Sequence, residues 1–408
     1  MKIYRFISLI IVAITFEACQ PEPEMISLGV DDEYAIQRMK ILHLHPEYPG
    51  DSYVWSMVDS NGCDSLISTD RDLYFVKKDP GVYNLKLYIK DDTDPYIHYF
   101  TVNVWKEEVA YERYITKVYE FCPAPGQFVN MLPKYENGDT EASMIKKVEE
   151  CISGKNDVLI SLGGYGGYVT FGFDHSVVNV PGEMDFKILG NSFYALENPN
   201  PDAPDSGGSS EPGIVMVSID RNGNGKPDDE WYELAGSEYY KPETAHHYTI
   251  TYYKPAENHV ATPKPNTPIT DTTYIPWMAN DGTTGYVEKN SYHSQDYFPK
   301  WISSDKLTFT GTRLAHNAVD ESGVGSYYVL YAYDWGYADN HPNEVADKSC
   351  FDIDWAVDKN GNPVKLDGID FIRVFTGVNQ SCGWLGETST EICRAEDLHI
   401  EKDFLPNP

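Results

Sequence analysis

The sequence predicts an all-β protein in two parts, and three observations support this fold class. Short apolar and aromatic runs alternate with turn residues along most of the chain, as in β-sandwiches. Tyrosine occurs 31 times in 408 residues, and aromatic residues favour strands. Helical periodicity is restricted to about residues 140–153. We therefore expect a small β-sandwich over residues 31–106, followed by a larger jelly-roll-type sandwich with long loops and one short helix over residues 107–408.

The first 18 residues have the features of a secretory signal peptide. Lys2 and Arg5 form a basic start, and the apolar run over residues 6–16 is too short to span a bilayer. This run ends in Phe16-Glu17-Ala18-Cys19, which resembles a bacterial lipobox, with Glu17 in place of the usual small or apolar residue. The resemblance implies lipidation of Cys19 and anchoring in a membrane. The alternative is an ordinary signal peptide with an incidental cysteine.

The composition of residues 19–30 predicts an acidic, flexible tether. Gln20-Pro21-Glu22-Pro23-Glu24 follows the cysteine directly and resembles the surface-export signal of Bacteroidota lipoproteins. That resemblance implies a protein anchored in the outer membrane that faces the extracellular side. The alternative is a tether that is merely solvated.

Residues 31–106 carry the turn signals of a small sandwich. Asn61-Gly62 predicts a hairpin, and Asp79-Pro80-Gly81 predicts a turn before a strand. The region around Trp55, this second turn and the closing strand over residues 98–105 resemble the PKD branch of immunoglobulin-like domains. The resemblance implies a spacer, so we expect no chemistry in this part.

The larger part begins with the predicted helix. Met144, Ile145, Val148 and Ile152 share one face, Asp139 or Thr140 is expected to cap its start, and Gly154 its end. Pro255 to Pro276 predicts a long loop. Strands are expected over residues 157–162, 168–173, 213–219, 248–253, 306–310, 327–333 and 369–376, and some of these runs are apolar throughout, as in strands buried between two sheets.

Charge and motifs narrow the class of function. The net charge of −31 argues against nucleic acid as a partner, because binding phosphates needs clustered Lys and Arg. Neither a Gly-x-Ser-x-Gly elbow nor a His-Glu-x-x-His helix occurs, which favours a binding protein over an enzyme. A glycosidase carboxylate pair leaves no such signature, because it is defined by distance in the fold. The glycine-rich residues 161–168 lack the ending of a P-loop and indicate close backbone approach.

One loop has the oxygen spacing of a calcium site. Oxygen side chains stand at positions 1, 3, 5 and 9 of a loop that starts at residue 220, and Gly225 stands at position 6, as in EF-hand-like loops. Position 12 is Trp231 rather than Glu, which resembles the truncated calcium loops of β-domains. The predicted ligands are Asp220, Asn222, Asn224, the carbonyl of Lys226, and Asp228. The alternative is a polar turn without metal.

Aromatic residues in predicted loops are the candidates for ligand contact. Rings beside Gly, Asn, Asp or Gln suit flat ligands rich in amides or hydroxyls. The alternative is that these rings pack under the loops. The rings that we expect to contact a ligand are Trp277, Trp301, Trp335, Tyr337 and Trp384. Among the cysteines, Cys382 with Cys393, or Cys122 with Cys151, are possible disulfide pairs, and free thiols are the alternative.

Several long strings resemble one family across nearly the whole mature chain. They are residues 122–128, 169–175, 209–218 and 334–340. These strings look like those of Bacteroidota cell-surface lipoproteins that join a PKD-like domain to a jelly-roll-like domain, with relatives linked to cobamide (vitamin B12) capture. The resemblance implies a surface protein that binds a cobamide and delivers it to an outer-membrane, TonB-dependent transporter. The alternatives are a glycan-binding or adhesion lipoprotein and, less favoured, a glycoside hydrolase.

Overall fold

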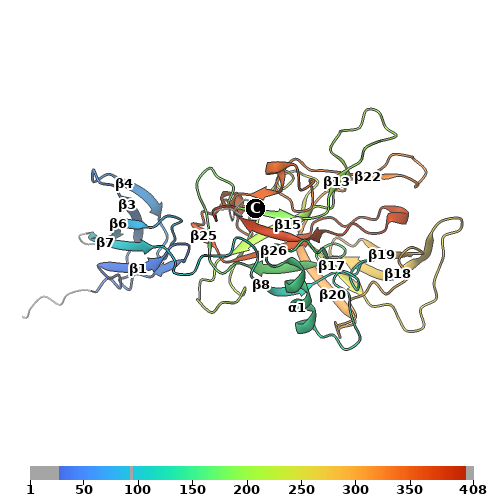
Figure 1. The fold of residues 1–408 in the computed structure, drawn as a ribbon, viewed down its shortest axis with the longest axis horizontal. Helices are drawn as coiled ribbons and strands as arrows, with labels where there is room; N and C mark the ends of the chain where they lie inside the picture. The colour runs from blue at the N-terminus through green and yellow to red at the C-terminus, as the bar shows by residue number, and fades with distance from the viewer. Residues whose placement is uncertain (1–26, 92–94, 401–408) are drawn as a thin grey trace, which may run out of the picture. The chain divides into compact units, whose positions relative to one another are not determined.

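The computed structural model describes residues 27–91 and 95–400 (Figure 1). The predicted signal peptide, Cys19 and most of the predicted tether lie outside the described residues. The chain divides into two compact units, and the smaller one holds residues 44–73 and 84–100. The larger unit holds residues 33–43, 74–83 and the chain from residue 101 onwards. Among the described residues, no helix has the length and apolar character that crossing a membrane requires.

The N-terminal strands form a five-stranded sheet and a two-stranded sheet. The five-stranded sheet has the order β1 (Glu33–Gln37), β7 (Tyr96–Trp105), β6 (Gly81–Lys90), β3 (Ser52–Val58) and β4 (Asp64–Ser68), and β2 (Leu42–Leu44) pairs with β5 (Leu73–Phe75). The predicted Asn61-Gly62 hairpin joins β3 to β4, with Gly62 at φ +77°. Trp55 is fully buried and packs edge-on against Phe100. The predicted all-β class is confirmed.

A six-stranded sheet lies at the centre of the larger unit (Figure 1). Its order is β24 (Ala356–Val357), β16 (Trp231–Leu234), β15 (Gly213–Ser218), β26 (Phe371–Thr376), β10 (Tyr168–Gly172) and β8 (Lys117–Cys122). Val215 and Val217 of β15 pack into one core together with the helix, whereas Ile214 packs into a second core on the opposite face. Both faces of the sheet are therefore covered, which explains the almost wholly apolar sequence of β15.

A four-stranded sheet covers the second face. Its order is β19 (Thr284–Asn290), β18 (Ile269–Ala279), β17 (Ala245–Tyr253) and β20 (Lys306–Arg313). The prediction of one long loop from Pro255 to Pro276 is wrong in its last part, because residues from Ile269 onwards form β18. The Thr-rich start of β18 pairs with β19 through two register shifts, and such irregular pairing weakens the sequence pattern of a strand.

Short strands complete the larger unit. Strands β23 (Cys350–Phe351), β12 (Phe186–Leu189) and β28 (Arg394–Asp397) form one sheet, and β13 (Phe193–Tyr194), β14 (Gly207–Ser209), β22 (Tyr328–Tyr331) and β21 (Ala318–Asp320) form another. Strand β27 (Glu391–Ile392) pairs with β9 (Ile160–Ser161), and β11 (Val177–Val178) pairs with β25 (Gly368–Ile369). Three short 3₁₀ turns cover Ala346–Ser349, Ile353–Trp355 and Gly383–Leu385.

The predicted helix is confirmed as α1 (Glu141–Ile152). Its start is capped reciprocally: Ser143 N–H donates to Thr140 Oγ1 at 3.3 Å, and Thr140 N–H donates to Ser143 Oγ at 2.8 Å. The predicted apolar face is buried against the central sheet through Met144, Val148 and Ile152.

The glycine-rich segment is a place of close backbone approach, as its composition predicts. Gly163 has φ +69°, and a methyl group on it would lie 1.9 Å from the carbonyl oxygen of Ala124. Any side chain at this position would push apart two segments that lie beside the cavities described below.

Candidate functional site

Three cavities lie next to one another in the larger unit. We name them the ring cavity (about 360 Å³), the acidic cavity (about 470 Å³) and the outer cavity (about 390 Å³). The loop between β26 and β27, residues 377–390, contributes to the walls of all three, and we call it the central loop. Each volume falls in the range of small-molecule sites.

The ring cavity takes its walls from the four-stranded sheet. Five aromatic side chains line it: Tyr165, Tyr248, Tyr252, Trp277 and Tyr286. The Arg313 guanidinium lies over the Tyr248 ring, 4.9 Å from its centroid, and places a cation beside this cavity. Tyr286 is half exposed, so its ring remains available for contact with a ligand.

The acidic cavity is named for Glu211, Glu387 and Glu391, which line it. Oxygens of Glu211, Glu391 and Asp339 all lie within 4.8 Å of one another, and Asp339 and Glu391 are almost completely buried. Asp339 accepts hydrogen bonds from the backbone N–H groups of Asn191, Ser192 and Glu391. The cluster is therefore held in place by backbone N–H groups from two separate segments of the chain.

Burial shifts the protonation of these groups. It raises the pKa of Glu211 to about 7 and that of Glu387 to about 8, and it raises the pKa values of Asp339 and Glu391 well above their ordinary range. Within the described residues, neither Lys nor Arg lines this cavity. Burial also lowers the pKa of His293 in its wall, so His293 brings no positive charge at neutral pH. These carboxyl groups therefore hold their protons to a higher pH than ordinary side-chain carboxyl groups do.

Glu387 stands between the ring cavity and the acidic cavity, because it lines both. Its Oε1 accepts a hydrogen bond from the backbone N–H of Gln127 at 2.6 Å. Its Oε2 is buried and has no hydrogen-bond partner among the described residues. An unpartnered buried carboxyl oxygen costs free energy, and a ligand hydroxyl in either cavity is the kind of group that relieves this cost.

Trp384 and Tyr292 separate the acidic cavity from the outer cavity, since both residues line each of them. Their ring centroids are 6.0 Å apart and the planes are tilted by 67°. The indole Nε1 of Trp384 donates to the carbonyl of Ser326 at 3.3 Å, which fixes the ring. Lys264 and Thr267 supply polar groups on the far side of the outer cavity.

The five predicted ligand-contact rings have different surroundings. Trp277 lines the ring cavity from β18, rather than from a loop, and Trp384 lines the acidic and outer cavities. Trp335 is half-buried and packs on Trp355, with ring centroids 4.6 Å apart. Trp301 and Tyr337 are 9% and 2% exposed and belong to the two cores. The structure thus brings Trp277 and Trp384 to neighbouring cavities and leaves the other three outside them.

The predicted calcium loop forms a tight turn between β15 and β16. Asp220 accepts from the backbone N–H groups of Asn224 and Gly225, at 3.0 and 2.8 Å. The carboxylate of Asp228 lies 2.9 Å from the amide of Asn222 and 3.0 Å from that of Asn224. Four of the predicted side chains therefore converge, and the calcium site stays a prediction.

Sequence reasoning missed Glu211 and Glu391, which the fold brings together from distant parts of the chain. One signal was available for Glu391: it stands among Thr390, Ile392 and Cys393 at the start of a buried strand, where a carboxyl group is unusual. The described cysteines, from Cys63 to Cys393, all carry free thiols.

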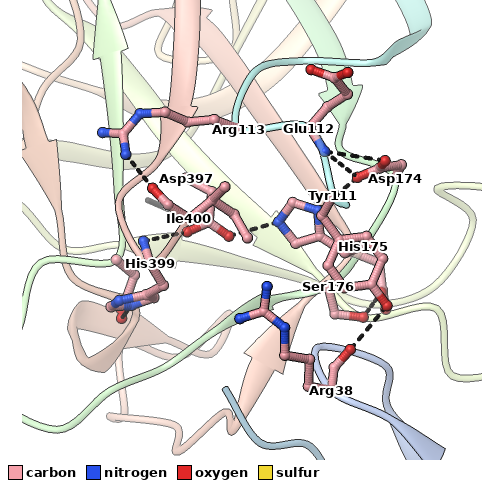
Figure 2. Close-up of polar contacts among 12 residues, drawn as sticks. Arg38, Tyr111, Glu112, Arg113, Asp174, His175, Ser176, Asp397, His399 and Ile400 are labelled. Carbon is pink, nitrogen blue, oxygen red and sulfur yellow. Dashed lines mark hydrogen bonds and ion pairs between the residues drawn. The ribbon is translucent and has the colours of Figure 1, made fainter. Parts of the chain in front are cut away.

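A second cluster of titratable groups lies around His175 and serves packing rather than ligand contact (Figure 2). The imidazole Nδ1 lies 2.7 Å from Asp174 Oδ1, and Nε2 lies 2.8 Å from Asp397 Oδ2. Asp397 also accepts from the backbone N–H of His399 at 2.6 Å. These contacts join the end of the described chain to the segment that follows β10.

Comparisons with known proteins give little beyond this geometry. No protein-family model matches the chain. A search of curated proteins also finds no match. Among solved structures, the SusE-like protein BT2857 matches with a TM-score of 0.24 and 10% sequence identity, over 89% of this chain and 95% of that one. We base no inference about function on a likeness of this level.

Proposed function

We propose that this chain is a non-catalytic binding protein that holds a glycan in the ring cavity and the acidic cavity. One observation carries the proposal: two cavities that share Glu387 and Thr388 combine aromatic faces with buried carboxyl groups. Sugars present an apolar face that stacks on rings such as Trp277 and hydroxyls that hydrogen-bond to carboxyl groups. Both kinds of group are close together here.

A cobamide is the second candidate ligand, because the family that the sequence resembles is linked to cobamide capture. Its corrin is a single rigid macrocycle rimmed by amides, and it needs one broad depression. Glu387 and Thr388 divide the space between the ring cavity and the acidic cavity. A sugar chain bends at each linkage and can place successive rings in successive cavities, so the geometry favours the glycan.

The setting of this activity is also part of the proposal. We propose that Cys19 carries a lipid anchor in the outer membrane, that the protein faces the extracellular side, and that it passes its ligand to a transporter. We further propose that residues 220–228 hold a structural Ca²⁺ ion. The sequence motifs described above support these steps.

Calorimetry with cyanocobalamin and with a panel of host and plant glycans tests the ligand class. Trp277→Ala is expected to weaken binding of the glycan by about 2 kcal/mol or more, because a central ring loses its contact area. The matched control is Trp105→Ala, which removes an exposed indole that lines none of the three cavities. If a cobamide binds and no glycan does, the cobamide replaces the glycan as the ligand. Release of sugars from a polysaccharide would show that the protein is an enzyme.

A further inference from the structure

We infer that the site accepts a chain of at least three sugar units, and that the unit in the acidic cavity is uncharged. This inference rests on the proposed glycan function and adds to it the length and the charge of the ligand. Its basis is the order of the three cavities and the chemistry of the side chains that separate them.

The cavities form a row because neighbours share residues. The ring and acidic cavities share Glu387 and Thr388, and the acidic and outer cavities share Tyr292 and Trp384. The ring and outer cavities have no lining residue in common among those described. The acidic cavity is therefore the middle one, and a ligand that fills all three must be elongated.

Each boundary has groups that suit a sugar on both of its sides. Trp384 and Tyr292 line both the acidic and the outer cavity, and aromatic rings at such a boundary suit stacking on a sugar. At the other boundary, Glu387 has an unpartnered Oε2, and the neighbouring Thr388 lines the same two cavities, the ring cavity and the acidic cavity. A chain that crosses both boundaries satisfies more of these groups than a single sugar does.

The middle position selects against negative charge. Glu211, Glu387 and Glu391 line the acidic cavity without a Lys or Arg among the described lining residues. A uronate or sulfate placed there would lose its water and find no cation among the described wall residues to replace it, which opposes binding. The cations stand in the flanking cavities, with Arg313 in the ring cavity and Lys264 in the outer cavity.

The test is a calorimetric length series. Neutral cello-, malto- and manno-oligosaccharides of one to six units are titrated into the protein, together with oligogalacturonides of the same lengths. For the neutral series that binds, we expect affinity to rise by at least about tenfold from one unit to three and then to level off. Oligogalacturonides are expected to bind at least about tenfold more weakly than neutral chains of equal length.

Two variants assign the effect to the row of cavities. Trp384→Ala is expected to reduce the affinity for the trimer while leaving the affinity for a single unit within about twofold. Lys264→Ala removes an exposed side chain of the outer cavity and should not disturb the fold. It is likewise expected to reduce the affinity for the trimer and to leave the affinity for a single unit within about twofold. Glu391→Gln replaces a buried carboxyl group of raised pKa by an amide of the same shape. The weaker binding of oligogalacturonides should therefore remain in this variant, because we attribute it to the lack of a cation among the described lining residues and not to a charge on Glu391.

The outcomes separate the two proposals. If a single sugar binds as tightly as its trimer, or if oligogalacturonides bind best, this inference is wrong while glycan binding stands. If none of the oligosaccharides binds, the proposed function fails and this inference fails with it.

Discussion

His175 shows how a single residue ties stability to pH. Burial lowers its pKa, but the hydrogen bonds to Asp174 and Asp397 raise it by more, so its pKa lies above the ordinary value of a histidine. Burial raises the pKa of Asp174, but the hydrogen bond with His175 lowers it, and the net shift is downward. The folded state thus favours a charged imidazole between two carboxylates (Figure 2).

We predict that His175→Gln lowers the free energy of unfolding by roughly 3 kcal/mol near pH 6, because it leaves the buried Asp397 carboxyl group without its cation. The carboxylate of Asp174 is exposed and adds little to this loss. A group with a raised folded pKa stabilises fully below its unfolded pKa of about 6.5, and loses that contribution as pH rises through the folded value. The difference between wild type and variant should therefore shrink toward pH 9. Urea denaturation across this range measures it.

The exposed His316 gives the control, since His316→Gln should change the free energy of unfolding little at any pH. A gap between wild type and His175→Gln that stays constant from pH 6 to pH 9 would show that the imidazole is neutral in the fold.

At the residue scale, the sequence predicted only part of the candidate site. Composition identified aromatic rings near turn residues, and Trp277 and Trp384 do line cavities. The same pattern selected Trp301 and Tyr337, which are buried, because a ring that packs under a loop and a ring that meets a ligand have the same neighbours in sequence. Glu211 and Glu391 could not be identified from the sequence, because only the fold brings their carboxyl groups close together.

At the scale of elements, the loop over residues 220–228 carries the metal prediction. Asp220 and Asp228 supply the two anionic groups, and we expect calcium to raise the melting temperature of the wild-type protein relative to chelator. The free energy of stabilisation behind that shift should follow RT ln(1 + [Ca²⁺]/Kd). The double variant Asp220→Ala/Asp228→Ala is expected to lose the shift, and differential scanning calorimetry measures it.

A matched loop provides the control for this experiment. Asp358 accepts from the backbone N–H groups of Asn360 and Asn362, in a turn of similar composition, Asp-Lys-Asn-Gly-Asn. Asp358→Ala should lower the melting temperature equally with calcium and with chelator. If calcium leaves the wild-type melting temperature unchanged, residues 220–228 form a plain turn held by their own hydrogen bonds.

Elements differed in how well the sequence predicted them, and packing explains the difference. Helix α1 was predicted almost to its ends, because one face is apolar at a regular period and Thr140 caps its start. Three strands of the central sheet, β10, β15 and β26, were predicted, because most of their residues are apolar and buried. Strands β8, β16 and β24 toward its edges were not predicted, because they are short or carry charged residues. Strand β18 was partly missed, because its first half is Thr-rich and pairs irregularly with β19.

For the whole molecule, the site depends on contacts between distant segments. The central loop runs from β26, in the middle of the six-stranded sheet, to β27, which pairs with β9. The glycine-rich segment passes close beside it, with Gly163 N–H donating to Ser389 Oγ at 3.1 Å. The ring cavity needs the four-stranded sheet in place, whereas the acidic cavity needs the central loop and the residues before β15. A binding site of this kind forms only when the complete larger unit has folded.

The proposed attachment to a membrane also concerns the whole molecule, and it rests on Cys19, which lies outside the described residues. We predict that Cys19→Ser yields a protein that is released or remains unprocessed, because the thiol is the expected site of acylation. Several acyl chains anchor far more stably than one, so the wild type should stay with the membrane fraction. Cell fractionation and the mass of the mature protein measure both outcomes.

Cys63→Ser is the control, since it removes an exposed thiol elsewhere in the chain and should leave anchoring unchanged. Protease treatment of intact cells then tests orientation. An extracellular protein is degraded without lysis, whereas complete protection until the outer membrane is opened would place it on the inner leaflet. In that position it could not capture a glycan from outside the cell, so this measurement bears on the proposed function as well as on the anchor.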